Sequence, residues 1–159
     1  QFDTISICFS KGLGAPVGSA VISSAERIAE SRIWRKRYGA GMRQIGFLAA
    51  AANFALDNNI SRLVEDHDKA KQIANACAQV SPDFIDAAGI ETNIVALNLS
   101  GIKISAPELN AQLKEEGILA SALGPKFLRL VTHLDISDSD MAKVLEVLPR
   151  LLKRALVAK

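Results

Sequence analysis

Apolar and small polar residues are interspersed at the start of the chain. Between Phe2 and Phe9 this pattern predicts a strand, which we expect to be buried. Three glycines and a proline between residues 12 and 18 predict a turn, and residues 17–22 predict a second strand. The chain is therefore expected to open with a hairpin-like pair of strands.

Two helices are predicted after this pair. Ser23 and Glu26 match the capping-box pattern, which begins a helix that we expect to reach about Arg37. The glycine-rich run over residues 39–41 breaks that helix. An alanine-rich second helix is predicted over residues 42–56.

The order of elements changes near residue 60. The elements predicted after it are a helix over 60–80, a loop over 83–92, a strand over 93–99, a helix over 105–116, strands over 118–122 and 127–132, and a last helix from Ser137. Capping boxes at Ser105 and Ser137 begin the last two helices, Gly117 ends the first of these, and Pro149 predicts a kink in the second. We therefore place an approximate domain boundary near residue 60. Residues 1–59 precede it, and residues 60–159 form a small α+β domain.

The composition limits the classes of protein to which this chain can belong. The chain has 159 residues, 49% of them hydrophobic, which suits one compact domain or two small ones with a real core. A net charge of +2 is too small to favour a nucleic-acid or membrane partner, and no apolar run is long enough to span a bilayer. The two cysteines make no disulfide framework and favour a reducing, cytoplasmic setting. Because the sequence opens directly in a strand pattern, we also expect it to be an incomplete chain.

Lys11 is the first candidate for chemistry. It lies in the run Ser10-Lys11-Gly12-Leu13-Gly14-Ala15-Pro16-Val17-Gly18-Ser19, between an apolar strand and a glycine-rich turn. A neutral lysine amine forms Schiff bases with carbonyl compounds, and burial or nearby positive charge lowers the lysine pKa towards that state. A lysine that points from a loop into water is the alternative. The glycines do not match a nucleotide loop, because Val17 replaces the third glycine of the dinucleotide fingerprint and no Gly-Lys-Ser/Thr occurs.

A basic stretch follows the hairpin. Its cations are Arg32, Arg35, Lys36, Arg37 and Arg43, and residues 39–41 supply a glycine loop. Such a loop before a helix offers free N–H groups to an anion, and Arg43 in the first helical turn would add a bidentate contact to a phosphate or carboxylate. A solvated helix face is an equal alternative, and a nucleic-acid patch has weak support on a chain so near neutrality.

Arg129 is the third candidate, because it places an arginine on a predicted apolar strand. A buried arginine requires an anionic partner, and a substrate carboxylate would serve. An internal salt bridge is the alternative, and spacing alone slightly favours it. His67 and His133 are far apart, as are Cys8 and Cys77, so no metal site is predicted. We interpret both histidines as structural or exposed and Cys8 as a packed thiol.

Four segments, in order, resemble the low-specificity L-threonine aldolases, which belong to the β-eliminating lyase group of fold-type I pyridoxal-phosphate enzymes. The segments are residues 10–19, the stretch Trp34-Arg35-Lys36 with Gly39-Ala40-Gly41-Met42-Arg43-Gln44, then Glu65-Asp66-His67, and Arg129-Leu130-Val131-Thr132-His133. They span most of the chain, and the first is fairly specific by itself.

The resemblance implies an enzyme and assigns roles. Pyridoxal 5'-phosphate would be the cofactor, held by Lys11 through a Schiff base, and Arg129 would bind the α-carboxylate of the substrate. Lys36 and Arg43 match positions near the active site, as contacts to the cofactor phosphate or to another subunit. The implied reaction is retro-aldol cleavage of a β-hydroxy amino acid, L-threonine or L-allo-threonine, to glycine and acetaldehyde.

Family members are considerably longer than this chain. The resemblance therefore implies an α/β fold in which residues 1–59 are the last part of the cofactor-binding large domain and residues 60–159 the small domain. The missing N-terminal half would be a required partner, the fragment alone would be inactive, and the assembly would be a homo-oligomer. Two alternatives stay open. One is a non-catalytic association module that docks through the helix over 42–56, and the other is a different fold-type I β-eliminating lyase.

Overall fold

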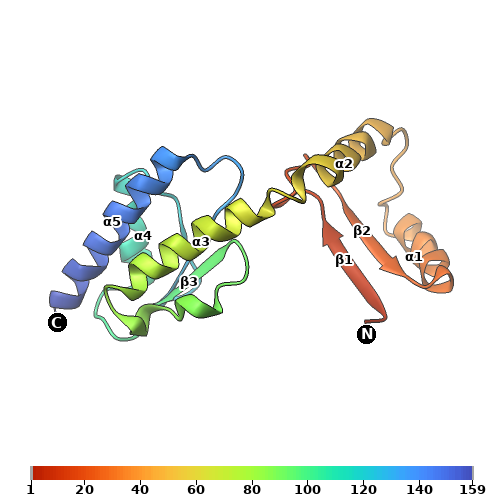
Figure 1. The fold of residues 1–159 in the computed structure, drawn as a ribbon. Helices are drawn as coiled ribbons and strands as arrows, with labels where there is room; N and C mark the ends of the chain where they lie inside the picture. The colour runs from red at the N-terminus through yellow and green to blue at the C-terminus, as the bar shows by residue number, and fades with distance from the viewer. Residues whose placement is uncertain (1, 159) are drawn as a thin grey trace. The chain divides into compact units, whose positions relative to one another are not determined.

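The computed structural model describes residues 2–158, and the chain divides between Leu63 and Val64 into two compact units (Figure 1). We call them the N-terminal unit and the C-terminal unit. Each has its own sheet, a two-stranded one in the first and a three-stranded one in the second.

The N-terminal unit opens with an antiparallel hairpin. Its strands are β1 (Thr4–Cys8) and β2 (Ser19–Ser23), in a register that places Ile5 opposite Ile22. The hairpin is as predicted, but the burial is not, because all five residues of β1 are exposed. Cys8 is likewise exposed and is not the packed thiol that the alternation suggested. The apolar pattern marks a strand that could be buried, whereas burial itself requires a covering layer.

Two helices follow the hairpin. Helix α1 (Ala25–Arg37) begins at Ser24, whose hydroxyl accepts a hydrogen bond from the backbone of Arg27, and not at Ser23 as predicted. The reason is that Ser23 is the last residue of β2, and its hydroxyl donates to the carbonyl of Asp3 across the hairpin at 2.6 Å. Strand pairing therefore occupies Ser23, and the neighbouring serine becomes the cap.

Helix α2 (Gly46–Asn59) begins four residues later than its alanine-rich composition predicted. Gln44 has φ 49°, in the left-handed region, and this conformation cannot be part of a right-handed helix. The helix carries one charged residue, Asp57, and buries only Ala52 and Ala55.

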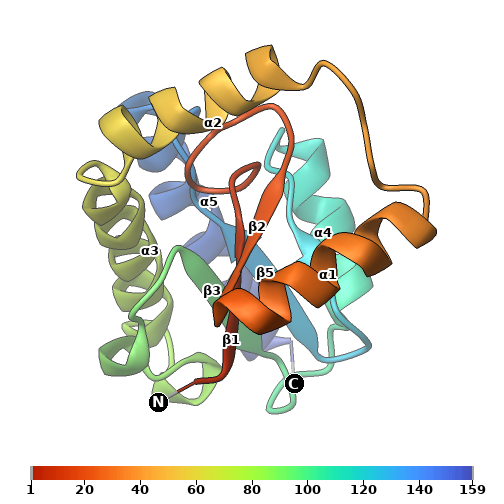
Figure 2. The same ribbon diagram turned by 90° about the vertical axis from the view of Figure 1, so that its right-hand side faces the viewer.

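Helix α2 runs over the loop of the hairpin (Figure 2), and a small apolar core holds the two together. Leu13 and Ala15 of the loop are buried with Ala55 of α2. The side-chain amide of Asn59 donates to the carbonyl oxygen of Leu13 at 2.7 Å, which fixes the end of the helix to the loop.

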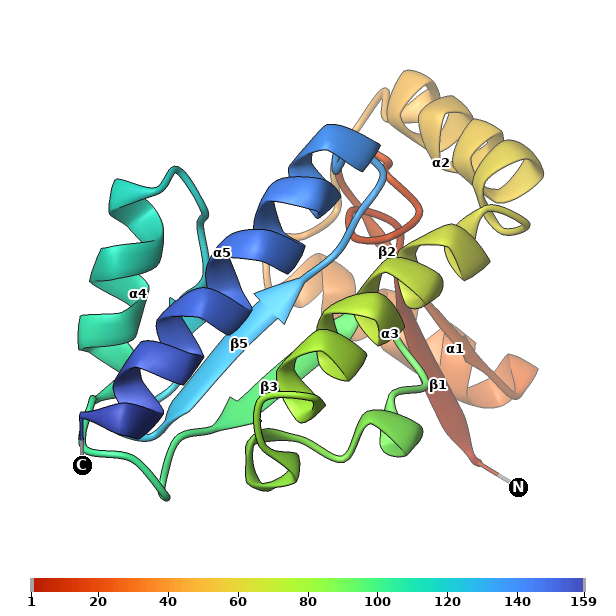
Figure 3. The same cartoon turned by 60° about the vertical axis from the view of Figure 1, so that its left-hand side comes forward.

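The C-terminal unit contains an antiparallel sheet in the order β3 (Ile94–Asn98), β5 (Phe127–Val131), β4 (Ser121–Ala122). Helices α3 (Leu63–Ala78), α4 (Ala106–Glu115) and α5 (Asp138–Val157) cover one face of this sheet (Figure 3). The segment predicted as a loop contains two short 3₁₀ helices, η1 (Pro82–Phe84) and η2 (Ala87–Gly89). All three α-helices and all the predicted strands of this unit are present, although β4 is shorter than expected.

The signals that begin α4 and α5 and the glycine that ends α4 are confirmed. Both predicted capping boxes form, at Ser105 and at Ser137. Gly117 ends α4 with φ 77°, donating to the carbonyl of Lys114, while Ile118 donates to the carbonyl of Leu113. Helix α5 continues past Pro149.

The helix layer and the sheet enclose one apolar core. Its fully buried large side chains include Phe84, Leu97, Leu109, Leu128, Leu148 and Leu152. Within residues 2–158 no helix combines the length and the apolar character that a bilayer crossing requires.

Candidate active site

The loop that carries Lys11 is held by backbone hydrogen bonds and by its own apolar anchors. Phe9 donates its N–H to Gly18 and accepts from Ala15, and the carbonyl of Lys11 accepts from Gly14 at 2.8 Å. Gly14 has φ 73°, which favours glycine at that position. A side chain at position 12 would meet Leu63 at 3.0 Å, so Gly12 is kept small by packing within the unit. The loop is thus held at several points by hydrogen bonds and packing.

This geometry presents the amine of Lys11 to the exterior. Lys11 is exposed, and among residues 2–158 its amine has no hydrogen bond or ion pair. Within the described residues Lys11 therefore points from its loop into water, which was the alternative that the sequence left open.

Lys36 and Arg43 lie in the same unit on either side of a tight turn. Lys36 is in the last turn of α1, and its Cδ lies 2.9 Å from where a side chain on Gly41 would begin. Arg43 precedes α2, so it does not occupy the first turn of that helix, contrary to the prediction. Helix α2 has Ile45 at its N-cap with no side-chain cap. No hydrogen bond or ion pair of the described residues joins Lys11, Lys36 and Arg43, so the structure places them in one unit without forming a cluster.

Arg129 is in the middle of β5, the central strand of the C-terminal sheet. It pairs with Ala96 of β3 on one side and with Ser121 of β4 on the other. Its strand neighbours Leu128 and Leu130 are buried in the core, and since side chains alternate along a strand, Arg129 belongs to the opposite face.

The guanidinium of Arg129 lacks a counter-ion among residues 2–158. Its Nε is buried and has no hydrogen-bond partner, and the half-buried side chain makes no ion pair with a described residue. The internal salt bridge that spacing slightly favoured is therefore absent from the described part of the chain. A buried donor without a partner costs roughly 1–3 kcal/mol, so this arginine is expected to require an external acceptor.

The sheet face around Arg129 is apolar and open. Ile94, Phe127 and Val131 share that face and are 45%, 50% and 43% exposed. A fixed cation surrounded by exposed apolar side chains suits a ligand or partner that carries a carboxylate next to an apolar group.

The histidines and cysteines do not form a metal site within residues 2–158, where no group of three or more His, Cys, Asp or Glu side chains is arranged to hold an ion. The Nδ1 of His133 lies 3.4 Å from a carboxylate oxygen of Asp135. Cys77 is buried, and this burial raises the pKa of its thiol to about 12.

Asp66 is the polar residue whose environment the sequence did not predict. It is fully buried in α3, and its carbonyl oxygen accepts a hydrogen bond from the hydroxyl of Thr132 at 2.6 Å. This contact ties α3 to the residue that follows β5, three positions after Arg129. The available signal was its position on the apolar stripe of α3, where Asp66 is followed at helical spacing by Ala70, Ile73 and Ala74.

The fold and these side chains define a class of protein. Residues 1–100 match the family model of the beta-eliminating lyases, and the chain belongs to that family. It is 40% identical over 140 residues to low-specificity L-threonine aldolase 1 of Arabidopsis thaliana, an alignment that covers 87% of this chain and 39% of the relative. The resemblance to low-specificity L-threonine aldolases is thereby confirmed.

Solved structures agree on the fold. A Listeria monocytogenes protein assigned as an L-allo-threonine aldolase superimposes with a TM-score of 0.66 at 18% identity, over 98% of this chain and 45% of that one. A structure described as SPT with PLP gives a TM-score of 0.71 at 17% identity, over 99% of this chain and 41% of that one. These likenesses confirm the predicted α/β fold class of the fold-type I enzymes. The chain spans about two fifths of the length of the curated relatives it matches.

Proposed function

We propose that this chain is part of a pyridoxal-phosphate-dependent aldehyde-lyase. The complete protein would cleave the β-hydroxy amino acids L-threonine and L-allo-threonine to glycine and acetaldehyde. Family membership and the named relatives support this reaction class. The chain by itself would be inactive, because its candidate residues are distributed over two units and do not enclose a site within either one.

The observation that carries the proposal is the unpartnered Arg129. Its Nε is buried on the central strand without an acceptor among residues 2–158, on a face where the neighbouring side chains are apolar. A guanidinium binds a carboxylate through two parallel hydrogen bonds, which also fix its orientation. We assign Arg129 to the α-carboxylate of the substrate. An anchored carboxylate limits how the amino acid can rotate, and this orientation decides which bond at Cα is broken.

Lys11 fits the role of the residue that holds the cofactor. Its amine has no competing partner among the described residues, and backbone hydrogen bonds hold its loop. A Schiff base requires the neutral amine, and the surroundings that favour this form would have to come from groups that cover the loop in the complete protein. Bound pyridoxal phosphate would supply an electron sink for the pair released from the Cα–Cβ bond.

Lys36 and Arg43 are assigned to the cofactor phosphate or to a subunit contact. Both are cations on the exposed surface of the N-terminal unit, and Arg43 lies just before the uncapped N-terminus of α2. Within this proposal, residues 1–59 are the end of the cofactor-binding domain and residues 60–159 are the small domain.

The proposal also includes a partner for the N-terminal unit. Helix α2 is apolar on its outer side as well as its inner one, since Ala52 and Ala55 are buried while Phe47 and Phe54 are 74% and 65% exposed. A helix of this kind is normally covered on both sides. We assign the cover to the polypeptide that the longer relatives carry and this chain lacks, in a cytoplasmic homo-oligomer.

The same exposed face favours a second candidate function, a non-catalytic association module. The two candidates differ in chemistry. An association module would bind its partner through α2 with Lys11 and Arg129 dispensable, whereas the lyase requires both. A different β-eliminating lyase would use both residues but would not release acetaldehyde from threonine.

The test uses the protein isolated from its own cells with an antibody to this chain. Reduction with borohydride in the presence of pyridoxal 5'-phosphate should attach the cofactor to Lys11, as read by peptide mass spectrometry. Incubation with L-threonine should release glycine and acetaldehyde in equal amounts. Reduction that labels no lysine, or labels a lysine other than Lys11, contradicts the assignment. If Lys11 is labelled but no acetaldehyde is released, the cofactor role of Lys11 stands and threonine is ruled out as the substrate.

A variant pair tests the substrate role of Arg129 in the same material. Arg129→Lys keeps the charge but loses the bidentate geometry, so we expect the KM for threonine to rise by about tenfold or more while borohydride labelling of Lys11 is unchanged. Arg150→Lys serves as a matched control on the surface of the same unit, where the arginine pairs with Glu116 at 2.8 Å. An unchanged KM in Arg129→Lys would contradict the assignment of Arg129 to the substrate carboxylate.

A further inference from the structure

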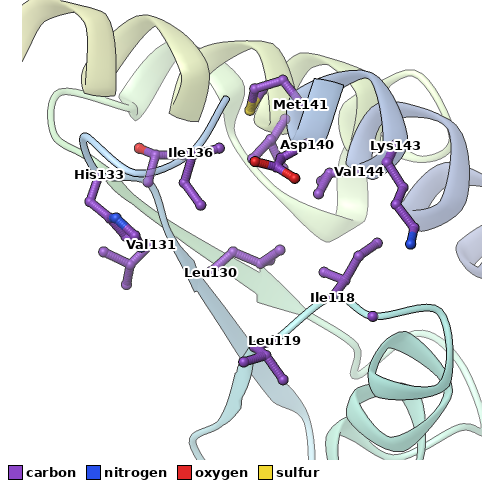
Figure 4. A pocket seen from close by; sticks show the side chains of 13 residues that line it. Ile118, Leu119, Leu130, Val131, His133, Ile136, Asp140, Met141, Lys143 and Val144 are labelled. Carbon is purple, nitrogen blue, oxygen red and sulfur yellow. The ribbon is translucent and has the colours of Figure 1, made fainter. Parts of the chain in front are cut away.

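The C-terminal unit contains a hollow that none of the candidate catalytic residues lines. It has a volume of about 310 Å³ and lies between the first turns of α5, the end of β5 and the segment that joins α4 to β4 (Figure 4). This volume is at the lower end of the roughly 300–1,000 Å³ range of small-molecule sites, so the hollow suits a small metabolite and not a large cofactor.

The hollow exists because β5 has only a short neighbour on one side. Strand β5 pairs with β3 along its full length, but β4 pairs with it only at Ser121 and Ala122. The chain that precedes β4 leaves α4 through the left-handed Gly117 and does not extend the sheet beside the end of β5. The space between this segment and α5 stays open.

The floor of the hollow is apolar. Ile73, Ile118, Leu130 and Met141 line it and are each less than a tenth exposed. At the mouth, Leu119 is 81% and Val131 43% exposed to solvent. A ligand therefore needs an aliphatic portion of a few carbons to displace water from this floor favourably.

The rim carries two opposite charges that do not pair with each other. Asp140 and Lys143 are three residues apart on α5 and line the hollow together, facing Leu130 and Ile118 in Figure 4. Asp140 accepts hydrogen bonds from the backbone and hydroxyl of Ser137 through Oδ2, and these bonds lower the pKa of its carboxyl. Its Oδ1 has no partner among residues 2–158. The ammonium of Lys143 also has none there, and it lies 3.3 Å from where a side chain on Gly117 would begin.

Two other polar side chains of the rim already have hydrogen bonds of their own, although Nε2 of His133 has no partner among residues 2–158. The hydroxyl of Thr132 donates to the carbonyl of Asp66, and Nδ1 of His133 accepts from the backbone of Asp135. The hollow therefore offers a ligand one carboxylate oxygen, one ammonium, the Nε2 of His133 and an apolar floor.

We propose that this hollow binds a free aliphatic α-amino acid at a site separate from the catalytic residues. The ligand ammonium would meet Oδ1 of Asp140, its carboxylate would meet the Lys143 ammonium, and its side chain would lie on Ile118 and Leu130. The site does not rest on the proposed lyase reaction, because neither Arg129 nor Lys11 lines the hollow.

The test is a titration of the ¹⁵N-labelled 159-residue chain with L-leucine, followed by the amide NMR signals. We expect saturable shifts at Gly117, Leu119, Val131 and Lys143. Three analogues each lack one feature: glycine lacks the aliphatic body, 4-methylpentanoate the ammonium, and 3-methylbutylamine the carboxylate. Each should bind about tenfold more weakly or worse, since each loses one charge-assisted contact or the apolar contact.

Two variants complete the experiment. Lys143→Met retains the stem and removes the ammonium, and it should weaken leucine binding by about tenfold, whereas Lys153→Met on the same helix should leave it unchanged. The absence of shifts at millimolar leucine overturns the proposal, as do equal affinities for the three analogues or an unchanged affinity in Lys143→Met. Shifts confined to Ala96, Ser121 and Arg129 also overturn it, because they report binding at the carboxylate site of the proposed function.

Discussion

Replacement of Arg129 by methionine is expected to stabilise the C-terminal unit. The buried Nε of Arg129 has no acceptor among the described residues, and a buried donor of this kind costs roughly 1–3 kcal/mol. Methionine has a similar length and no donor, so it retains the packing of the stem and removes the penalty. Because the rest of the guanidinium is only half-buried and reaches water, we take the lower end of that range. The free energy of unfolding should rise by about 1 kcal/mol.

The assay is urea unfolding of the 159-residue chain, followed by two signals. Trp34 is the only tryptophan and belongs to the N-terminal unit, so its fluorescence reports that unit. Far-UV circular dichroism also reports α3, α4 and α5 of the C-terminal unit. With a typical urea slope, a gain of this size moves the circular-dichroism midpoint upward by roughly 0.5 M, while the fluorescence midpoint stays in place.

The control separates a missing partner from a general effect of removing an arginine. Arg150 pairs with Glu116 at 2.8 Å on the surface of the same unit. Arg150→Met should lower the free energy of unfolding by about 0.2–1 kcal/mol, as for other exposed ion pairs. The two variants are thus expected to change stability in opposite directions. A loss of 1 kcal/mol or more in Arg129→Met would refute the reasoning, because it would mean that the guanidinium stabilises the unit.

Three further results are expected of the same chain. Leu148→Ala should lower the free energy of unfolding by about 2–5 kcal/mol in urea titrations, because Leu148 is fully buried and the truncation leaves a cavity. Cys8 should react with a thiol reagent in the folded chain, whereas Cys77 should react only after unfolding, since its thiol is buried with a pKa raised to about 12. Hydrogen bonds from the cap serines lower the pKa of Glu108 and Asp140, so the stabilisation that these carboxylates provide is complete above the ordinary carboxyl pKa values near pH 4 and is lost as the pH falls through the lowered values. Measuring the unfolding midpoint as a function of pH checks this, and the expectation is contradicted if Asp140→Asn loses as much stability at acid pH as the unchanged chain.

The sequence predicted the elements of the C-terminal unit well, because their signals are local. The capping boxes at Ser105 and Ser137 and the left-handed Gly117 act through hydrogen bonds between residues a few positions apart. Such contacts form in the same way whatever packs around them. The prediction failed at the start of α1 and α2, where Ser23 was taken by a cross-strand partner and Gln44 adopted a conformation that no helical pattern reveals.

For the candidate site, too, the sequence predicted the local features and not the tertiary ones. The residue types and motif order identified Lys11, Lys36, Arg43 and Arg129 and the family to which the chain belongs. Their surroundings were beyond the sequence, because a counter-ion or a hollow depends on which elements meet. The favoured salt bridge of Arg129 is absent from the described residues, and the hollow beside Lys143 follows from a strand that pairs at only two positions.

The sequence by itself therefore determined which segments form helices and strands and the caps of α4 and α5, since these depend on backbone bonds and side-chain types within short segments. The tertiary structure decided which side chains are buried and which have a hydrogen-bond or ion-pair partner. It left β1 and the outer face of α2 exposed and Arg129 without an acceptor among the described residues, because burial and ion pairing depend on neighbours that are distant in sequence or belong to another molecule.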